Sequence, residues 1–226
     1  MAKPRLLDLF CGAGGAAMGY HRAGFEVVGV DINPQPNYPF EFWQRDALDV
    51  LGWLTTFSDN PASNFAAIHA SPPCQLYSVA NNIHGNDDHP DLLPITRTLL
   101  QATGLPYVIE NVPGAPMENY IVLCGLSFGL GVKRHRWFET SFMVMVPPCP
   151  PGHPGDWVSV FGHTVLERGH VTGKAKGGGN TIKRKHLGIA RGREAMGIDW
   201  MNRAELSESI PPAYTEHIGQ YLLEAL

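Results

Sequence analysis

The stretch Leu-Leu-Asp-Leu-Phe-Cys-Gly-Ala-Gly-Gly at positions 6–15 predicts a strand that ends in a glycine turn and leads into a helix. Glycine lets the backbone of such a turn approach a ligand closely, and the first amides of a helix favour negatively charged groups. A β-branched run over residues 26–32 contains Asp31, whose carboxylate could accept hydrogen bonds from both hydroxyls of a ribose. The pattern is as typical of a nicotinamide or flavin site as of an S-adenosylmethionine site, and a tight turn without a ligand is a further alternative.

Strands and helices are predicted to alternate through the rest of the first half of the chain. Apolar runs over residues 65–69 and 106–109 predict two more buried strands, and residues 92–103 have apolar side chains at helical spacing. This order indicates the α/β class, with a Rossmann-like, doubly wound and mostly parallel sheet. Such a sheet binds ligands at the carboxyl ends of its strands.

The character of the chain changes near residue 144. Residues 147–152 contain four prolines, and residues 173–180 are rich in glycine, so no long helix or strand is expected there. We therefore expect a catalytic and cofactor-binding domain over residues 1–143, a small irregular insertion over residues 144–189, and helices over residues 190–226 that return to the first domain.

Composition limits the classes of protein to which the chain can belong. Of its 226 residues, 44% are hydrophobic and 17% are charged, as in an ordinary globular protein. No apolar run approaches the ~20 residues of a membrane helix, and the N-terminus lacks a signal-peptide pattern, so we expect a cytoplasmic protein. The four cysteines include no Cys-x-x-Cys pair, and we predict neither a disulfide framework nor a metal site. We also expect a monomer.

Charge is distributed unevenly along the chain. The formal net charge is -4, but residues 133–203 carry twelve Lys and Arg against five Asp and Glu. A basic segment in an acidic chain is what a polyanion-binding surface would need. A solvated basic surface explains the charge alone equally well.

Three further motifs bring reactive or polar side chains to predicted strand ends. Pro-Pro-Cys-Gln at positions 72–75 follows a strand, and its two prolines stiffen the turn that presents the thiol of Cys74. Glu-Asn-Val at positions 110–112 ends another strand, where a buried acid has a raised pKa and can donate a proton. In Arg-His-Arg at positions 134–136, the two arginines would point the same way and form a fork for a carbonyl or a phosphate. A buried small side chain, a helix cap and a basic edge strand are the ordinary structural explanations of these three motifs.

Together and in this order, these motifs resemble those of the DNA cytosine-5 methyltransferase family. The resemblance continues into Arg-Glu-Ala at positions 193–195 and into Ser-Ile-Pro-Pro at positions 209–212, so it spans nearly the whole chain. It implies S-adenosylmethionine as the cofactor, cytosine-containing DNA as the partner, and a bacterial or phage-infected cell as the setting. The cofactor-binding residues that it implies are Phe10, Gly12, Gly14, Gly15, Asp31, Asp46 and Pro73.

The resemblance also implies a covalent mechanism. The thiolate of Cys74 would attack carbon 6 of a cytosine flipped out of the duplex, while Glu110 protonates ring nitrogen 3. Arg136, with Arg134, would hold the carbonyl oxygen of the base, and Asn111 would orient the loop. Residues 75–91 would close over the base.

The chain departs from the family pattern at several positions. Ile32 replaces an aromatic residue that often stacks on adenine, Val132 replaces a glutamine, and Glu208 stands where an asparagine is usual. The stretch between Arg136 and Arg193 is short for a target-recognition region. Three alternatives therefore stay open: a tRNA or RNA cytosine-5 methyltransferase, a catalytically idle DNA-binding homologue, and an oxidoreductase. The RNA alternative is weakened by the absence of the Cys-Phe-Thr tripeptide typical of that branch.

Overall fold

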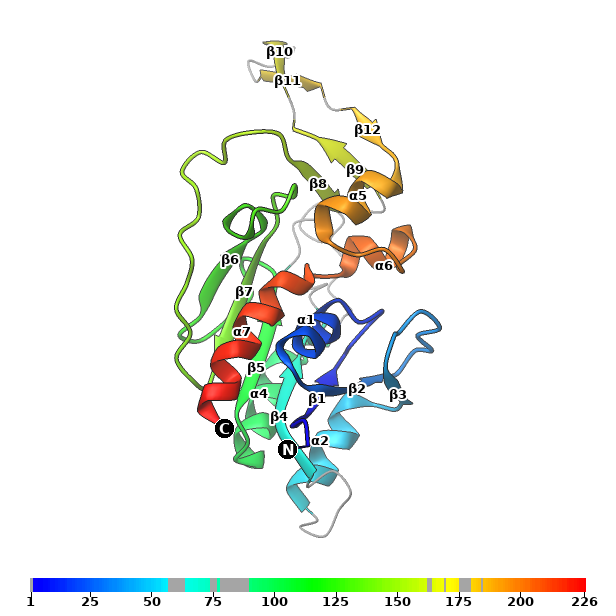
Figure 1. The fold of residues 1–226 in the computed structure, drawn as a ribbon, viewed down its shortest axis with the longest axis vertical. Helices are drawn as coiled ribbons and strands as arrows, with labels where there is room; N and C mark the ends of the chain where they lie inside the picture. The colour runs from blue at the N-terminus through cyan, green and yellow to red at the C-terminus, as the bar shows by residue number, and fades with distance from the viewer. Residues whose placement is uncertain are drawn as a thin grey trace.

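A seven-stranded sheet forms the centre of the protein (Figure 1). The structure is a computed structural model that describes residues 2–56, 64–73, 77, 90–161, 164–168, 170–174, 180–183 and 185–226. Strand order is β3-β2-β1-β4-β5-β7-β6, in which the first five strands are parallel and β7 runs antiparallel to both of its neighbours. The strands are β1 (Arg5–Leu9), β2 (Glu26–Asp31), β3 (Glu41–Gln44), β4 (Phe65–Ala70), β5 (Tyr107–Asn111), β6 (Ile121–Cys124) and β7 (His135–Thr140).

Helices cover both faces of this sheet (Figure 1). Helices α1 (Gly15–Ala23) and α7 (Pro212–Ala225) pack together on one face, and α2 (Ala47–Thr56) and α4 (Leu93–Thr103) pack together on the other. Successive side chains of β1 alternate between the two cores: Leu6 belongs to the core under α1 and α7, and Leu7 to the core under α2 and α4. Burial on both faces explains why the strands have continuous apolar runs. The predicted doubly wound α/β fold is confirmed.

A second group of strands lies beyond the carboxyl end of the main sheet. Strands β8 (Val158–Phe161), β9 (Thr164–Glu167) and β12 (His186–Leu187) form an antiparallel sheet, and β10 (His170–Lys174) pairs with β11 (Asn180–Lys183) as a separate ribbon. Helices α5 (Ile189–Met196) and α6 (Arg203–Glu208) pack on the three-stranded sheet through a third apolar core. The insertion that the sequence predicts as irregular thus contains short antiparallel strands.

A long strap joins β7 to β8 without forming a helix or strand of its own. We call residues 141–157 the strap; it runs along the outer side of β6 and β7 in Figure 1. The hydroxyl of Ser127 donates to the carbonyl of Pro148 (3.0 Å), and Nε2 of His217 lies 2.7 Å from the carbonyl oxygen of Met145. Met143 and Met145 are exposed, whereas Val144 between them is buried in the core under α1 and α7.

No helix in the described part of the chain has the length and apolar character needed to cross a membrane.

Candidate active site

A cleft of about 480 Å³ opens at the carboxyl ends of β1, β2, β4 and β5. This is the edge of the sheet at which the sequence motifs predict a site. Its lining includes eight of the predicted site residues: Phe10, Gly12, Gly15, Asp31, Asp46, Pro73, Glu110 and Arg136. Gly14, Asn111 and Arg134 are not in the lining. Cys74, the predicted nucleophile, and most of the predicted closing loop lie outside the described residues.

The glycine turn presents open backbone to the cleft. Gly12 has φ +47°, and a Cβ added there would meet nothing within 4 Å, so this part of the turn is free to approach a ligand. Gly14 has φ +83°, and a Cβ there would lie 2.9 Å from Cδ of Pro39. Gly15 is packed against the carbonyl of Ile210, which ties the start of α1 to the C-terminal segment. Gly12 therefore leaves open space beside the turn, whereas Gly14 and Gly15 are closely packed by Pro39 and Ile210.

Two carboxylates on the cleft wall are held by backbone amides. Asp31 accepts hydrogen bonds from the amides of Gly12 (3.1 Å) and Asn33 (2.9 Å), so the second strand and the glycine turn are tied together. Asp46 accepts from the amide of Leu48 (2.7 Å) at the start of α2. These contacts fix the orientation of both carboxylates before any ligand arrives.

Asp8 is a cleft residue that the sequence motifs did not single out. Its side chain is fully buried, with the hydroxyl of Tyr38 and the backbone of Ala17 beside the carboxyl group. Burial raises the pKa of Asp8 well above its usual value, and the negative charge of Asp31 adds to this effect. With its pKa raised in this way, the carboxyl favours its neutral, protonated form, because a carboxylate buried without a compensating cation is costly. The sequence did contain a signal for Asp8, because this residue lies within the motif that ends in the glycine turn.

Glu110 and Arg136 form an ion pair in the cleft. Oε1 of Glu110 lies 3.0 Å from Nε of Arg136, and both side chains are largely buried. Burial raises the pKa of Glu110, and the charges of Arg136 and Arg134 oppose this effect only in part. Glu110 is thus an acid that can hold its proton to a higher pH than an exposed glutamate, beside a fixed cation.

Asn111 and Arg134 support the site from outside the cleft. The side-chain amide of Asn111 donates to the carbonyl of Pro72 (3.1 Å), so it holds the turn that precedes Cys74. Arg134 donates to the carbonyls of Val160 (2.5 Å) and Ser207 (2.8 Å). Its guanidinium therefore joins β8 and α6 to the start of β7, and it does not form the predicted fork with Arg136 in the cleft lining.

A buried histidine links the interior to the cleft. His69 on β4 lies with Nδ1 3.0 Å from the hydroxyl of Tyr20 and with Nε2 3.0 Å from the hydroxyl of Ser71. Complete burial lowers the pKa of His69 to about 3, so the ring is neutral at physiological pH. Ser71 in turn interacts with Glu110. The neutral ring therefore orients Ser71 beside the acid of the site.

The far wall of the cleft comes from the C-terminal segment, into which the sequence resemblance extends at residues 209–212. Glu205, Glu208, Ser209 and Ile210 line it, and Asn37 donates to both carboxylate oxygens of Glu205 (2.9 and 3.0 Å). Trp200 donates through its indole N–H to the carbonyl of Ala13 (2.8 Å). The last third of the chain thus completes a site that begins at the first strand.

A parallel sheet closed by an antiparallel hairpin, with a glycine turn after β1 and an acid at the end of β2, defines an S-adenosylmethionine-dependent methyltransferase fold. Solved structures agree. The S. pombe Dnmt2 methyltransferase matches with a TM-score of 0.61 and 14% identity, covering 99% of each chain. A DNA modification methyltransferase from a prophage of E. coli matches with a TM-score of 0.59 and 16% identity, covering 98% of this chain and 99% of that one. Because the sequence identities are this low, the similarity to these two structures establishes the fold alone.

Sequence comparison identifies the family. Residues 4–120, just over half of the chain, match the family described as C-5 cytosine-specific DNA methylase, and the chain belongs to this family. It is 30% identical over 121 residues to the Type II methyltransferase M.AquIA of Picosynechococcus sp., covering 49% of this chain and 49% of that protein. It is also 30% identical over 119 residues to M.NgoMIV of Neisseria gonorrhoeae, covering 50% of this chain and 38% of that protein. The chain thus spans about half or less of the length of these relatives.

Proposed function

We propose that this protein transfers a methyl group from S-adenosylmethionine to carbon 5 of cytosine in DNA. The main support is that two interactions lie in the same cleft: the hydrogen bond between Gly12 and Asp31, and the ion pair between Glu110 and Arg136. The first pair suits an adenosine cofactor, and the second suits the protonation of a base. An oxidoreductase has no evident use for the second pair, so the geometry favours methyl transfer to a base over that alternative.

The residues of the cleft fit the proposed cofactor. Asp31 has its orientation fixed for a ribose, and the open face of Gly12 lets a ligand approach the turn. A cation bound beside Asp8 would stabilise its ionised form, and S-adenosylmethionine carries both an ammonium and a sulfonium. Phe10, Asp46 and Pro73 would complete the contacts. When bound, the cofactor supplies an electrophilic methyl group.

The protein's own residues would activate the base. Cys74 adds its sulfur to carbon 6 of cytosine, and the carbon 5–carbon 6 π electrons shift as ring nitrogen 3 takes a proton from Glu110. Carbon 5 then has the electron density to accept a methyl group. A base removes the proton from carbon 5, the carbon–sulfur bond breaks to release the thiolate, and ring nitrogen 3 returns its proton to Glu110. Arg136 stabilises the ionised Glu110 that the first proton transfer leaves behind.

We propose residues 144–189 as the target-recognition region. Their basic charge suits the phosphates of DNA, and a cytosine must leave the stack to reach the cleft. Most of the described residues here belong to short antiparallel strands joined to the catalytic sheet through Arg134. Arg134 thus acts as a positioning residue between the two parts.

The test is a map of methylated cytosines. A mixed-sequence plasmid propagated with the protein should show 5-methylcytosine at a defined motif on bisulfite sequencing. RNA from the same cells should be tested for 5-methylcytosine in the same way. Methylation confined to RNA would replace DNA by RNA as the substrate, and no methylation of either, with a folded protein, would favour an idle binding homologue.

The role of Asp31 predicts a loss of cofactor affinity on its removal. In Asp31→Ala, binding of S-adenosylhomocysteine should weaken by roughly 10–100-fold, because hydrogen bonds to a charged group contribute about 1.5–3 kcal/mol. Isothermal calorimetry measures this. Asp31→Asn keeps an acceptor for the amide of Gly12 and should show a smaller loss. Equal affinity in all three proteins would contradict the assignment.

The role of Asp8 predicts a pH dependence of cofactor binding. Because burial raises its pKa, binding of a cation to the ionised form should strengthen as pH rises through that raised pKa. Asp8→Asn should bind S-adenosylmethionine more weakly and without this slope. S-adenosylhomocysteine has the same ammonium but no sulfonium, so comparing the two ligands identifies the group that Asp8 faces. An unchanged slope in Asp8→Asn would assign the pH dependence to another residue.

A further inference from the structure

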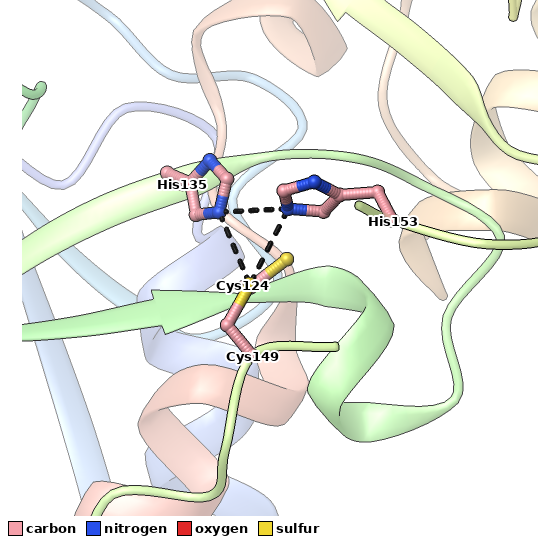
Figure 2. Close-up of side chains that lie close together, drawn as sticks. All are labelled: Cys124, His135, Cys149 and His153. Carbon is pink, nitrogen blue, oxygen red and sulfur yellow. Dashed lines mark hydrogen bonds between the residues drawn. The ribbon is translucent and has the colours of Figure 1, made fainter. Parts of the chain in front are cut away.

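Four side chains of metal-ligating type converge beside the catalytic sheet, away from the cleft. Cys124 ends β6, His135 begins β7, and Cys149 and His153 lie in the strap. One ligand atom from each lies within 4.8 Å of all the others, and Figure 2 shows the four side chains pointing toward a common centre. The cluster thus joins the β6–β7 hairpin to the strap.

The distances within the cluster match those around a tetrahedral zinc ion. Zinc–sulfur bonds of ~2.3 Å and zinc–nitrogen bonds of ~2.05 Å at tetrahedral angles put two nitrogens ~3.3 Å apart and a nitrogen and a sulfur ~3.6 Å apart. Nε2 of His135 and Nε2 of His153 are 3.2 Å apart. Sγ of Cys149 lies 3.5 Å from the first and 3.3 Å from the second.

The chemistry of the donor set selects the metal. Two thiolates and two imidazoles are a common structural zinc set, whereas magnesium and calcium prefer oxygen ligands. Four protein ligands leave no open position for a substrate or water, so the site would be structural. A disulfide between Cys124 and Cys149 would use the sulfurs but would leave the convergence of both Nε2 atoms on the same point unexplained.

We propose that Cys124, His135, Cys149 and His153 bind one structural Zn²⁺ that fastens the strap to the β6–β7 hairpin. His135 is the residue next to Arg136 on β7, and successive side chains of a strand point to opposite faces. The metal therefore holds β7 on the face opposite the ion pair of Arg136 and Glu110. It also fixes the strap, most of which belongs to the region proposed to recognise DNA and which leads to β8.

The metal content of the full-length protein tests the proposal directly. Protein purified under reducing conditions without added chelator should contain about one zinc per chain by elemental mass spectrometry. After zinc is removed, Co²⁺ should bind with the intense visible absorption of a tetrahedral, thiolate-ligated cobalt ion. This readout uses the wild-type chain and does not depend on the folding of any variant. Protein that carries no zinc and takes up neither ion, or that contains a Cys124–Cys149 disulfide by thiol counting, would overturn the proposal.

Variants separate metal binding from other contacts of the strap. Cys149→Ser and His153→Asn should each lower the zinc content and the affinity for Co²⁺. His217→Asn is the matched control, since it removes the contact of His217 with Met145 in the strap but no ligand, and it should retain zinc. Chelation should lower the melting temperature of the wild type by ~5 °C or more, because a ligand that binds only the folded state stabilises it. Equal zinc content in all three variants would show that the metal is bound elsewhere.

Discussion

Replacement of Cys74 by alanine is expected to lower methyl transfer by on the order of 10⁴–10⁶-fold, the scale of losing a covalent nucleophile. Carbon 5 of cytosine is a poor nucleophile until a group has added to carbon 6, and no other residue of the proposed mechanism can supply that electron pair. Cofactor binding should persist, because the contacts at Gly12 and Asp31 do not involve Cys74. Transfer of a labelled methyl group to plasmid DNA measures the loss.

Covalent capture identifies the residue independently of rate. DNA that contains 5-fluorocytosine should trap the wild-type protein, because fluorine cannot leave as a proton and elimination stalls. Cys74→Ala should form no adduct, whereas Cys11→Ala, in which a different cleft cysteine is changed, should still be trapped. Peptide mapping of the wild-type adduct gives the site of attachment. Attachment to any other cysteine would remove Cys74 from the mechanism.

The fold was predictable where burial on both faces forces a simple pattern. The glycine turn was predicted to lead into a helix, and α1 begins at Gly15; the β-branched run over residues 26–32 contains β2 (Glu26–Asp31). Strand β3 (Glu41–Gln44) escaped prediction because an edge strand of four residues, with polar residues at both ends, has no distinctive period. The short strands of the insertion were not predicted either, because the prolines and glycines around them are typical of loops.

The candidate site was predictable where a motif follows a strand directly. Gly12, Asp31 and Glu110 each come at or just after a strand end, and parallel strands bring such residues to one edge. Arg134 deviates because β7 begins only at His135, so strand alternation does not govern where its side chain points.

Residues that meet only through tertiary structure could not be found in this way. Glu205 lies in α6 and reaches the cleft because the following helix, α7, returns to pack on α1. The zinc cluster unites β6, β7 and the strap, and its strongest linear signal was Cys-Pro-Pro-Gly-His at positions 149–153. Considered alone, the cysteine pattern pointed away from a metal, since it has no Cys-x-x-Cys pair.

The second large effect is expected at Glu110. Glu110→Gln keeps the size of the side chain but cannot donate a carboxylic proton to ring nitrogen 3, so the rate of methyl transfer should fall by on the order of 10²–10⁴-fold. The buried pair with Arg136 fixes the geometry, and an amide in place of the acid still fills the same space. Single-turnover methylation with saturating DNA and cofactor isolates this chemical step from product release. A gel-shift assay should show that DNA binding persists.

The pH profile distinguishes an acid from a group that only positions the base. Burial raises the pKa of Glu110, and the proposed mechanism uses its protonated form. The single-turnover rate of the wild type should therefore decline as pH rises through that raised pKa, and the decline should be absent from the residual activity of Glu110→Gln. His69 cannot produce the same limb, because its pKa is lowered to about 3 and its ring stays neutral throughout. If Glu110→Gln kept both a near-normal rate and the wild-type pH limb, another group would have to protonate the ring, and the ion pair with Arg136 would be structural.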